Sequence, residues 1–337
     1  MKNEKELRWM MKWKRSYLAL LSVVWMALGA ARAGVLTVYA AGPDGFDRGV
    51  CAAFQEKTGE KVELWSSTTG KVMARLQAEH ANPHADVVIL ADQSAGLDLQ
   101  EQGLVSPYHP SSIVERLRSD LRTGSEFLPM GADTVALVVN VKQLPGGRKP
   151  LDWDSLGGRD FKDQVTMPNP LLAGTASDFV LAMLQQRPQE GWAFFDALKK
   201  NGAIWPGPNE AALQPVVLGS RSVLVAGVGH TALEAREKGN SLDLVFPSSG
   251  TLLIPRPIII LKSSRNQEDA RKFVDFVFSD QGQGLASKAL LIPAVKSVKP
   301  DKAWPDLSQV KFWTVDWKRV ASSRAEVLQR FKAEVLQ

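Results

Sequence analysis

From residue 34 onward, short apolar runs alternate with longer amphipathic segments. Residues 35–40 and 61–65 have the composition of strands, and each is followed by a segment with helical spacing, at 46–58 and 69–79. Residues 85–91 form a run that is apolar except for Asp86, which is typical of a parallel strand buried on both faces. Strands that alternate with helices in this way predict a doubly wound α/β sheet.

The alternation resumes after residue 133, and a chain of 337 residues is long enough for two domains of about 100–200 residues each. We expect further strands at 133–141, 164–167, 222–226 and 254–261. We expect helices at 177–186, 231–238 and 268–279, and a further helix whose last residues are 196–201. The strand at 254–261 contains Pro255 and Pro257. Proline has no N–H for a central ladder, so we expect this segment to begin at the edge of a lobe or to run through a connection.

The N-terminus has the three parts of a secretory signal peptide. Six basic residues lie within the first fifteen, an uncharged run covers 16–31, and Ala31-Arg32-Ala33 is a cleavage motif. The apolar core is shorter than the roughly 20 residues that span a bilayer, so residues 1–33 are predicted to be a cleaved signal, with an uncleaved anchor as the alternative. No cysteine stands at the cleavage site, which argues against a lipoprotein. In a bacterium, such a signal indicates export to the periplasm.

Removing this segment changes the charge of the protein. The full chain has 41 basic and 36 acidic residues and a formal charge of +5. Residues 1–33 contain seven of the basic and two of the acidic residues, which leaves 34 of each. A neutral mature chain does not favour a nucleic-acid partner. The single cysteine, Cys51, excludes an intramolecular disulfide, and its apolar neighbours predict a buried thiol.

A run of hydroxyl side chains, Ser66, Ser67, Thr68 and Thr69, connects a predicted strand to a predicted helix. The Gly70-Lys71 that follows does not complete a P-loop, because the first glycine and the final Ser or Thr are missing. A helix N-terminus with adjacent hydroxyls favours an anionic ligand. Helix capping is the alternative, although four consecutive hydroxyls exceed what one cap requires.

Other polar loops also follow strands, and the carboxyl ends of strands are where open α/β sheets bind ligands. These loops supply the remaining candidate ligand-binding residues, which are Asn169, Gly174, Thr175, Ala176, Ser177, Asn209, His230, Ser248 and Ser249. Each loop is also compatible with an ordinary turn or cap, and His230 with a structural histidine. The G-x-G-x-x-A pattern at 227–232 lies too late in the chain to favour dinucleotide binding.

Motifs of enzymes and metal sites are absent from the sequence. There is no G-x-S-x-G or H-E-x-x-H pattern, and Pro83 separates His80 from His84, which excludes a helical metal pair. We therefore predict no catalytic residue, no metal ligand and no cofactor.

Taken in order, several segments resemble the periplasmic solute-binding proteins of ABC importers, in the branch that contains ferric-ion, 2-aminoethylphosphonate and sugar-phosphate binders. The segments that carry the resemblance are residues 36–40, 66–75, 82–87, 103–105, 138–140, 174–176 and 270–283. The resemblance implies a type II periplasmic binding protein, a Venus-flytrap of two α/β lobes with a doubly wound sheet in each and two crossing strands as the hinge. It places lobe 1 at 34–133 plus 258–337 and lobe 2 at 134–257.

The resemblance also implies a monomer that delivers its solute to an inner-membrane ABC permease. Ferric binders of this branch use adjacent tyrosines in the second lobe, whereas the mature chain has only Tyr39 and Tyr108, both in the first. An organophosphonate or a phosphate ester therefore fits better. Ferric ion remains one alternative, and a secreted α/β enzyme that acts on a phosphate ester is another.

Overall fold

The protein is described here by a computed structural model that covers residues 34–337, and the predicted signal peptide lies outside the described residues. The strands follow the order β2 (Val62–Ser66), β1 (Leu36–Ala40), β3 (Val87–Ile89), β8 (Leu253–Ile260), β4 (Leu128–Asn140), β6 (Val223–Val228) and β5 (Val165–Thr166). Two more strands, β7 (Leu242–Val245) and β9 (Ile292–Pro293), pair with β4. One continuous set of strands therefore connects the two predicted lobes.

The first lobe is built on β1, β2 and β3, which pair in parallel. Each of these strands leads into a helix: α2 (Asp44–Thr58), α3 (Thr69–Ala78) and α4 (Gln93–Glu101). Side chains of β1 alternate between two cores, with Val38 and Ala40 in one and Tyr39 in the other. A sheet with a core on each face is doubly wound, as predicted.

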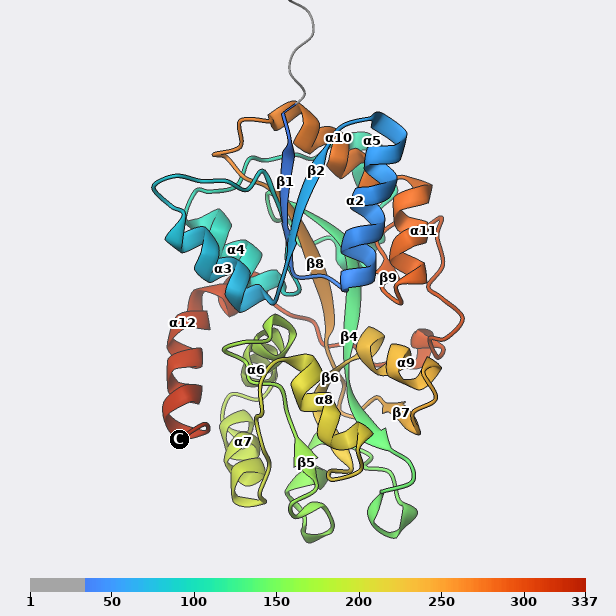
Figure 1. Cartoon of the computed structure of the whole chain (residues 1–337). Coiled ribbons are helices and arrows are strands. Elements are labelled where there is room, and N and C mark those ends of the chain that lie inside the picture. Colours follow the sequence, from blue (N-terminus) through green and yellow to red (C-terminus); the bar gives the residue numbers. More distant parts are fainter. Residues whose placement is uncertain (1–33) are drawn as a thin grey trace, which may run out of the picture. The chain divides into compact units, whose positions relative to one another are not determined.

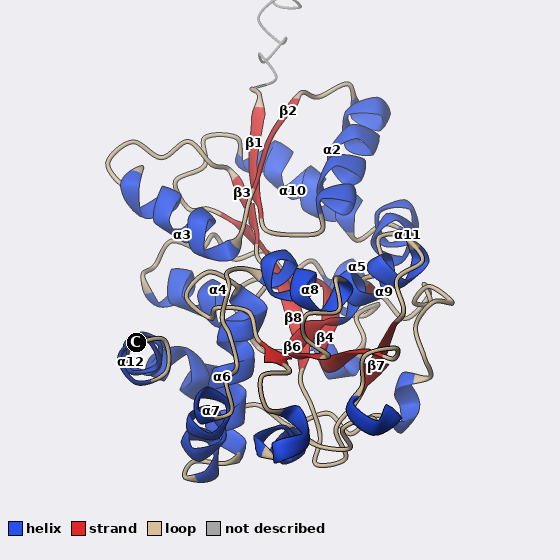
Figure 2. Cartoon of the chain, turned by 60° about the horizontal axis from the view of Figure 1, so that its bottom comes forward, coloured by secondary structure: helices blue, strands red, loops and turns tan. Residues whose placement is uncertain are grey.

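The second lobe is built on the parallel strands β5 and β6 together with the far half of β4. Its helices are α6 (Gly174–Gln186), α7 (Glu190–Lys200), α8 (Asn209–Val217) and α9 (Gly229–Glu237). In β4, Leu137 and Val139 pack into one core, while Val138 between them packs into the other. The predicted second α/β sheet is confirmed, and Figure 2 shows helices around the strands of both sheets.

The strands β4 and β8 run antiparallel through both lobes and match the two predicted crossing strands (Figure 1). Of the two alternatives for this segment, a start at a lobe edge is wrong, because β8 lies between β3 and β4, whereas a run through the connection between the lobes agrees with its crossing position. Leu90 donates its N–H to the carbonyl of Pro257, so the backbone groups of odd-numbered residues of β8 point toward β3. The ladder with β3 ends at Ile258. Pro255 and Pro257 therefore lack N–H groups where no ladder needs them.

Four helices complete the described part of the chain: α5 (Ser111–Val114), α10 (Gln267–Val277), α11 (Asp280–Lys288) and α12 (Trp317–Glu334). The amphipathic helix predicted near 268–279 is α10, which buries Phe273, Val274 and Val277. Cys51 lies in the same core, and burial raises the pKa of its thiol to about 12, as expected for an unreactive cysteine. Among the described residues, no helix is long and apolar enough to cross a membrane.

The C-terminal helix α12 contacts elements of both lobes. Ala321 packs into a first-lobe core, and Arg324 pairs with Asp98 of α4 at 3.1 Å. Further along, Phe331 and Val335 pack into a second-lobe core. The lobe boundaries given by the resemblance remain a prediction. The helix α12 packs against elements on both sides of the predicted boundary.

Candidate ligand-binding cavity

A cavity of about 790 Å³ lies between first-lobe and second-lobe elements. Residues from the first turns of five helices line it, namely α2, α3, α6, α8 and α9. In none of the five does the N-cap side chain accept a hydrogen bond from the helix. Helix N-termini carry unpaired N–H groups and the positive end of the helix dipole, so this convergence makes the cavity suited to an anion.

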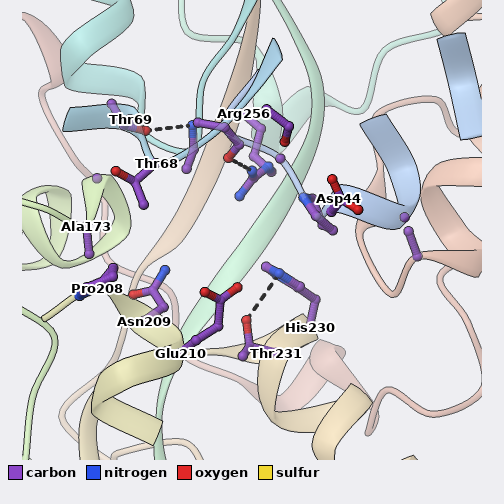
Figure 3. Close-up of a pocket in the computed structure, with 18 of the residues that line it drawn as sticks. Asp44, Thr68, Thr69, Ala173, Pro208, Asn209, Glu210, His230, Thr231 and Arg256 are labelled. Carbon is purple, nitrogen blue, oxygen red and sulfur yellow. Dashed lines mark hydrogen bonds between the residues drawn. The ribbon is translucent and has the colours of Figure 1, made fainter. Parts of the chain in front are cut away.

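The predicted hydroxyl loop lies on the first-lobe wall, where Ser66, Ser67, Thr68 and Thr69 all line the cavity (Figure 3). Two of the four hydroxyls have structural roles. Ser66 Oγ donates to Asp47 at 2.9 Å, and Thr69 Oγ1 accepts from the Ala91 N–H at 3.3 Å. Within residues 34–337 no hydrogen bond is formed by the hydroxyls of Ser67 and Thr68, which leaves both available to a ligand.

A second first-lobe loop, residues 42–45, lines the cavity beside the hydroxyl loop. The Asp47 carboxylate joins the two loops, since it accepts from the Gly42 N–H at 3.2 Å as well as from Ser66. A Cβ on Gly42 would lie 2.3 Å from Asp47 Oδ1, so a larger residue would break this junction. Burial raises the pKa of Asp47 to about 6, although the Ser66 hydroxyl and the Arg256 guanidinium oppose the rise.

Arg256 lies at the junction of this wall with β8 and is only 1% exposed. Its Nη2 donates to the Ala41 carbonyl at 2.7 Å, while Nε has no partner in the described part of the chain. Burial lowers the pKa of the guanidinium, and nearby Asp133, Asp47 and Asp92 oppose that change. A guanidinium that lines the cavity, holds its charge and keeps an unused donor supports an anionic ligand.

The second-lobe wall is formed by the first residues of α8 and α9 (Figure 3). Asn209, Glu210, His230 and Thr231 line it. Asn209 Nδ2 donates to the Thr175 hydroxyl at 3.1 Å, which fixes its amide group. The Glu210 carboxylate points toward the cavity and has no partner among residues 34–337. This wall therefore places an acceptor opposite the donors of the first lobe.

His230 is held in place by the crossing strand β4. Its ring Nδ1 contacts the carboxylate of Asp133, which is fully buried, and its backbone N–H donates to Asp133 Oδ1 at 3.3 Å. The other ring nitrogen lies 3.2 Å from the Thr231 hydroxyl. This fixed orientation makes His230 part of the cavity wall rather than an isolated structural histidine.

The remaining predicted residues divide into three groups. Gly174 lines the cavity, but Thr175, Ala176 and Ser177 are fully buried behind it in α6. Asn169 closes its own turn by accepting from the Leu171 N–H at 2.9 Å, and it does not line the cavity.

The prediction for Ser248 and Ser249 is not supported, because both hydroxyls donate to Asp152 at 2.5 Å, outside the cavity. The Ser249 N–H donates to the same carboxylate at 2.7 Å. Asp152, from a distant part of the sequence, therefore takes up these donors, and they are not free for a ligand.

Neither tyrosine of the described chain lines the cavity. Tyr39 donates to Glu79 at 2.8 Å and Tyr108 to Asp275 at 2.9 Å. Burial and these carboxylate partners raise the pKa of both phenols to about 12, which opposes the tyrosinate form that ferric ion requires. No cluster of three His, Cys, Asp or Glu side chains suited to a metal ion occurs within residues 34–337.

Several lining residues were not predicted from the sequence, chiefly Arg256, Thr231, Lys71 and Lys288. A signal for one of them was present. Arg256 is the only charge in an otherwise apolar strand, and a buried strand retains such a residue when its charge has partners or a ligand.

Comparison with known proteins identifies the family. Residues 82–323 match the family model described as bacterial extracellular solute-binding protein. The chain belongs to this family. Members are binding proteins, and the solute-binding proteins that resemble this chain include components of ABC transporters.

Two relatives are named for the solutes that they bind. A periplasmic protein of Salmonella typhimurium, assigned by name to 2-aminoethylphosphonate binding, is 24% identical over 94% of this chain and 98% of its own length. The major ferric iron-binding protein of Neisseria meningitidis is 25% identical over 79% of this chain and 82% of its own length.

Solved structures confirm the fold of a solute-binding protein. The periplasmic binding protein AfuA of Actinobacillus pleuropneumoniae, with fructose-6-phosphate bound, has a TM-score of 0.83 at 22% identity and covers 90% of this chain and 99% of its own. Iron-bound HitA of Pseudomonas aeruginosa has a TM-score of 0.78 at 21% identity, covering 88% and 98%. Both share the mixed α/β fold with the present chain.

Proposed function

We propose that this solute-binding protein captures an organophosphonate or a phosphate ester in the periplasm and delivers it, as a monomer, to an ABC permease. The observation that carries the proposal is the convergence of five helix N-termini and buried Arg256 on one cavity. Phosphonate and phosphate oxygens accept several hydrogen bonds at once, and free N–H groups at helix N-termini are suited to them. The N-terminal sequence supports export to the compartment where such a protein works.

Glu210 supports a more specific solute. Its carboxylate faces the first-lobe wall across the cavity and forms no ion pair within residues 34–337. A solute with a phosphonate at one end and an ammonium group at the other would match both walls. The Salmonella relative, assigned to 2-aminoethylphosphonate, is consistent with such a ligand. The ferric alternative is weaker, because both tyrosines are engaged elsewhere.

A thermal unfolding screen of the mature protein tests the proposal. We expect 2-aminoethylphosphonate to stabilise the fold by about 2.7 kcal/mol at a hundredfold excess over its Kd. Propylphosphonate, fructose-6-phosphate, inorganic phosphate, sulfate and ferric citrate form the comparison set. Stabilisation by ferric citrate alone would reject an anionic solute, and steady turnover of a phosphate ester would reject a pure binding function.

Glu210→Gln separates the two ends of the ligand. We expect it to weaken binding of 2-aminoethylphosphonate about tenfold or more, because a charged hydrogen bond contributes about 1.5–3 kcal/mol. Propylphosphonate has no ammonium group, so its affinity, measured by the same calorimetric titration, should not change. Equal losses of affinity for both ligands would show that Glu210 shapes the cavity and does not bind the ammonium group of the ligand.

A further inference from the structure

Two buried carboxylates lie directly behind the cavity, where α4 of the first lobe meets α6 of the second. Asp92 is the N-cap residue of α4 and Asp178 belongs to α6, and both are fully buried. Asp178 accepts the N–H groups of Gln93 at 2.7 Å and Ser94 at 3.3 Å. A second-lobe carboxylate therefore caps a first-lobe helix, immediately beside the carboxylate that precedes it.

Asp92 also touches the wall where we place the anion. A Cβ on Gly174 would lie 2.0 Å from Asp92 Oδ1 and 2.7 Å from Thr69 Oγ1, and both Gly174 and Thr69 line the cavity. Neither oxygen of Asp92 has a hydrogen-bond partner of good geometry among the described residues. Its nearest ion-pair partner is Arg324 of α12, at 3.8 Å.

The cations around the pair are fewer than the carboxylates. Arg324 also pairs with Asp98 of α4, and Arg256 of β8, which acts on Asp92 from a greater distance, is shared with Asp47 and Asp133. The neighbouring residue of α3, Thr69, carries no charge.

Burial raises the pKa of Asp178 to about 8, and the charge of Asp92 adds to the rise. Burial raises the pKa of Asp92 as well, opposed by Arg324. A solute anion at Thr69 and Gly174 would add a further negative charge next to Asp92.

We propose that capture of the anion is coupled to uptake of one proton, which the Asp92–Asp178 pair holds while the two lobes enclose the solute. The proton comes from solvent and binds one carboxylate oxygen, so the pair carries a single negative charge. Opening of the lobes separates Asp178 from its N–H donors on α4, exposes the pair to water and releases the proton. The inference rests on the proposed function, because it requires an anion at this wall.

The direction of the pH dependence follows from the higher proton affinity of the enclosed pair. A water-exposed aspartate has a pKa of about 4, so the enclosed form binds more protons between that value and about 8. Affinity for the solute should therefore rise as the pH falls through this window, by up to about tenfold per pH unit. It should level off below the lower value, where both forms are protonated.

Isothermal titration calorimetry measures the coupled proton directly. Binding of 2-aminoethylphosphonate at pH 7 is compared in two buffers of different ionisation enthalpy, for the wild type, Asp178→Asn and Asp92→Asn. The proton exchange of the ligand itself occurs in all three proteins, so the difference between them reports the pair. We expect the wild type to take up about one proton more than either variant. Asp154→Asn, at a surface ion pair with Arg187, is the matched control and should behave as the wild type.

An infrared difference spectrum gives a second measurement. The C=O band of a protonated carboxyl should appear when the wild type binds the solute and be absent from Asp178→Asn. Equal proton uptake in the wild type and in whichever asparagine variants fold, with no such band, would overturn the coupling. A wild type that binds none of the phosphonates or phosphates would instead overturn the proposed function, so the two failures are distinct.

Discussion

Two hydroxyl-rich loops that look alike in the sequence have opposite surroundings in the fold. Ser67 and Thr68 end in a cavity and form no side-chain hydrogen bond within residues 34–337, whereas Ser248 and Ser249 both donate to Asp152. The first loop keeps its donors for a ligand, whereas the donors of the second are taken up by Asp152, a residue from a distant part of the sequence. The number of hydroxyls in a loop therefore does not predict a binding site. What matters is whether the fold brings a hydrogen-bond acceptor within reach of those hydroxyls.

The strongest test of this contrast places the same carboxylate in each loop. Ser67→Asp should weaken phosphonate binding about a hundredfold or more, because it puts a negative charge where the anion binds. Ser248→Asp should leave the affinity unchanged and lower only the stability, through repulsion from Asp152. Calorimetric titration and thermal unfolding of both variants check the prediction. Similar affinity losses in the two variants would remove the distinction between the loops.

Gly174→Ala tests a third loop, of which only the first residue reaches the cavity. The new Cβ would lie 2.0 Å from Asp92 Oδ1, inside a packed junction that cannot yield easily. We expect about tenfold weaker binding, equivalent to about 1.4 kcal/mol, together with a lower melting temperature. Gly284→Ala, where no atom lies within 4 Å of the new Cβ, is the control. Unchanged affinity in Gly174→Ala would place the anion elsewhere on the wall.

The smallest effect is expected from Asp152→Asn, which changes the acceptor of the excluded Ser248–Ser249 loop. Burial alone would raise the pKa of Asp152, but hydrogen bonds from Ser248, Ser249 and the Trp153 N–H hold it below its usual range. A lowered pKa stabilises the fold above about pH 4, and this stability is lost as the pH falls through the lowered value. Because water partly screens this carboxylate, the variant should lose only about 0.5–1 kcal/mol at neutral pH, with part of its acid sensitivity. Its phosphonate affinity, measured in parallel, should equal that of the wild type.

Much of the fold was predictable because hydrophobic residues recur at regular spacings in its strands and helices. Parallel strands such as Val87–Ile89 are apolar throughout, and the helix at 268–279 has a clear amphipathic face, so local sequence determines both. The prolines of β8 left two alternatives open, an edge or a connection, because the position of a missing N–H relative to a neighbouring ladder depends on register. Register is set by the whole sheet and cannot be read from the strand itself.

A cavity residue was predictable from the sequence only where it lies in a loop between a predicted strand and a predicted helix. Ser67 and Asn209 lie in loops that open helices, so their places at the sheet edge follow from the βα pattern. Arg256 was missed because it lies inside a crossing strand, and its contact with the cavity arises from packing between distant segments. Thr175 and Ser177 do not reach the wall, since helical rotation turns them into the core behind Gly174.

The attachment of α12 to both lobes has a consequence for the order of assembly. Every other helix of the second lobe precedes residue 238, but Phe331 and Val335 complete its core. A chain that emerges from its N-terminus cannot finish the second lobe until its last few residues are available. The C-terminal segment thus forms contacts with residues far away in the sequence. Folding that depends on such long-range contacts is slow, because a long stretch of chain must first be brought together. Removal of residues 331–335 should therefore leave a gap in the core of the second lobe, although every other helix of that lobe is present.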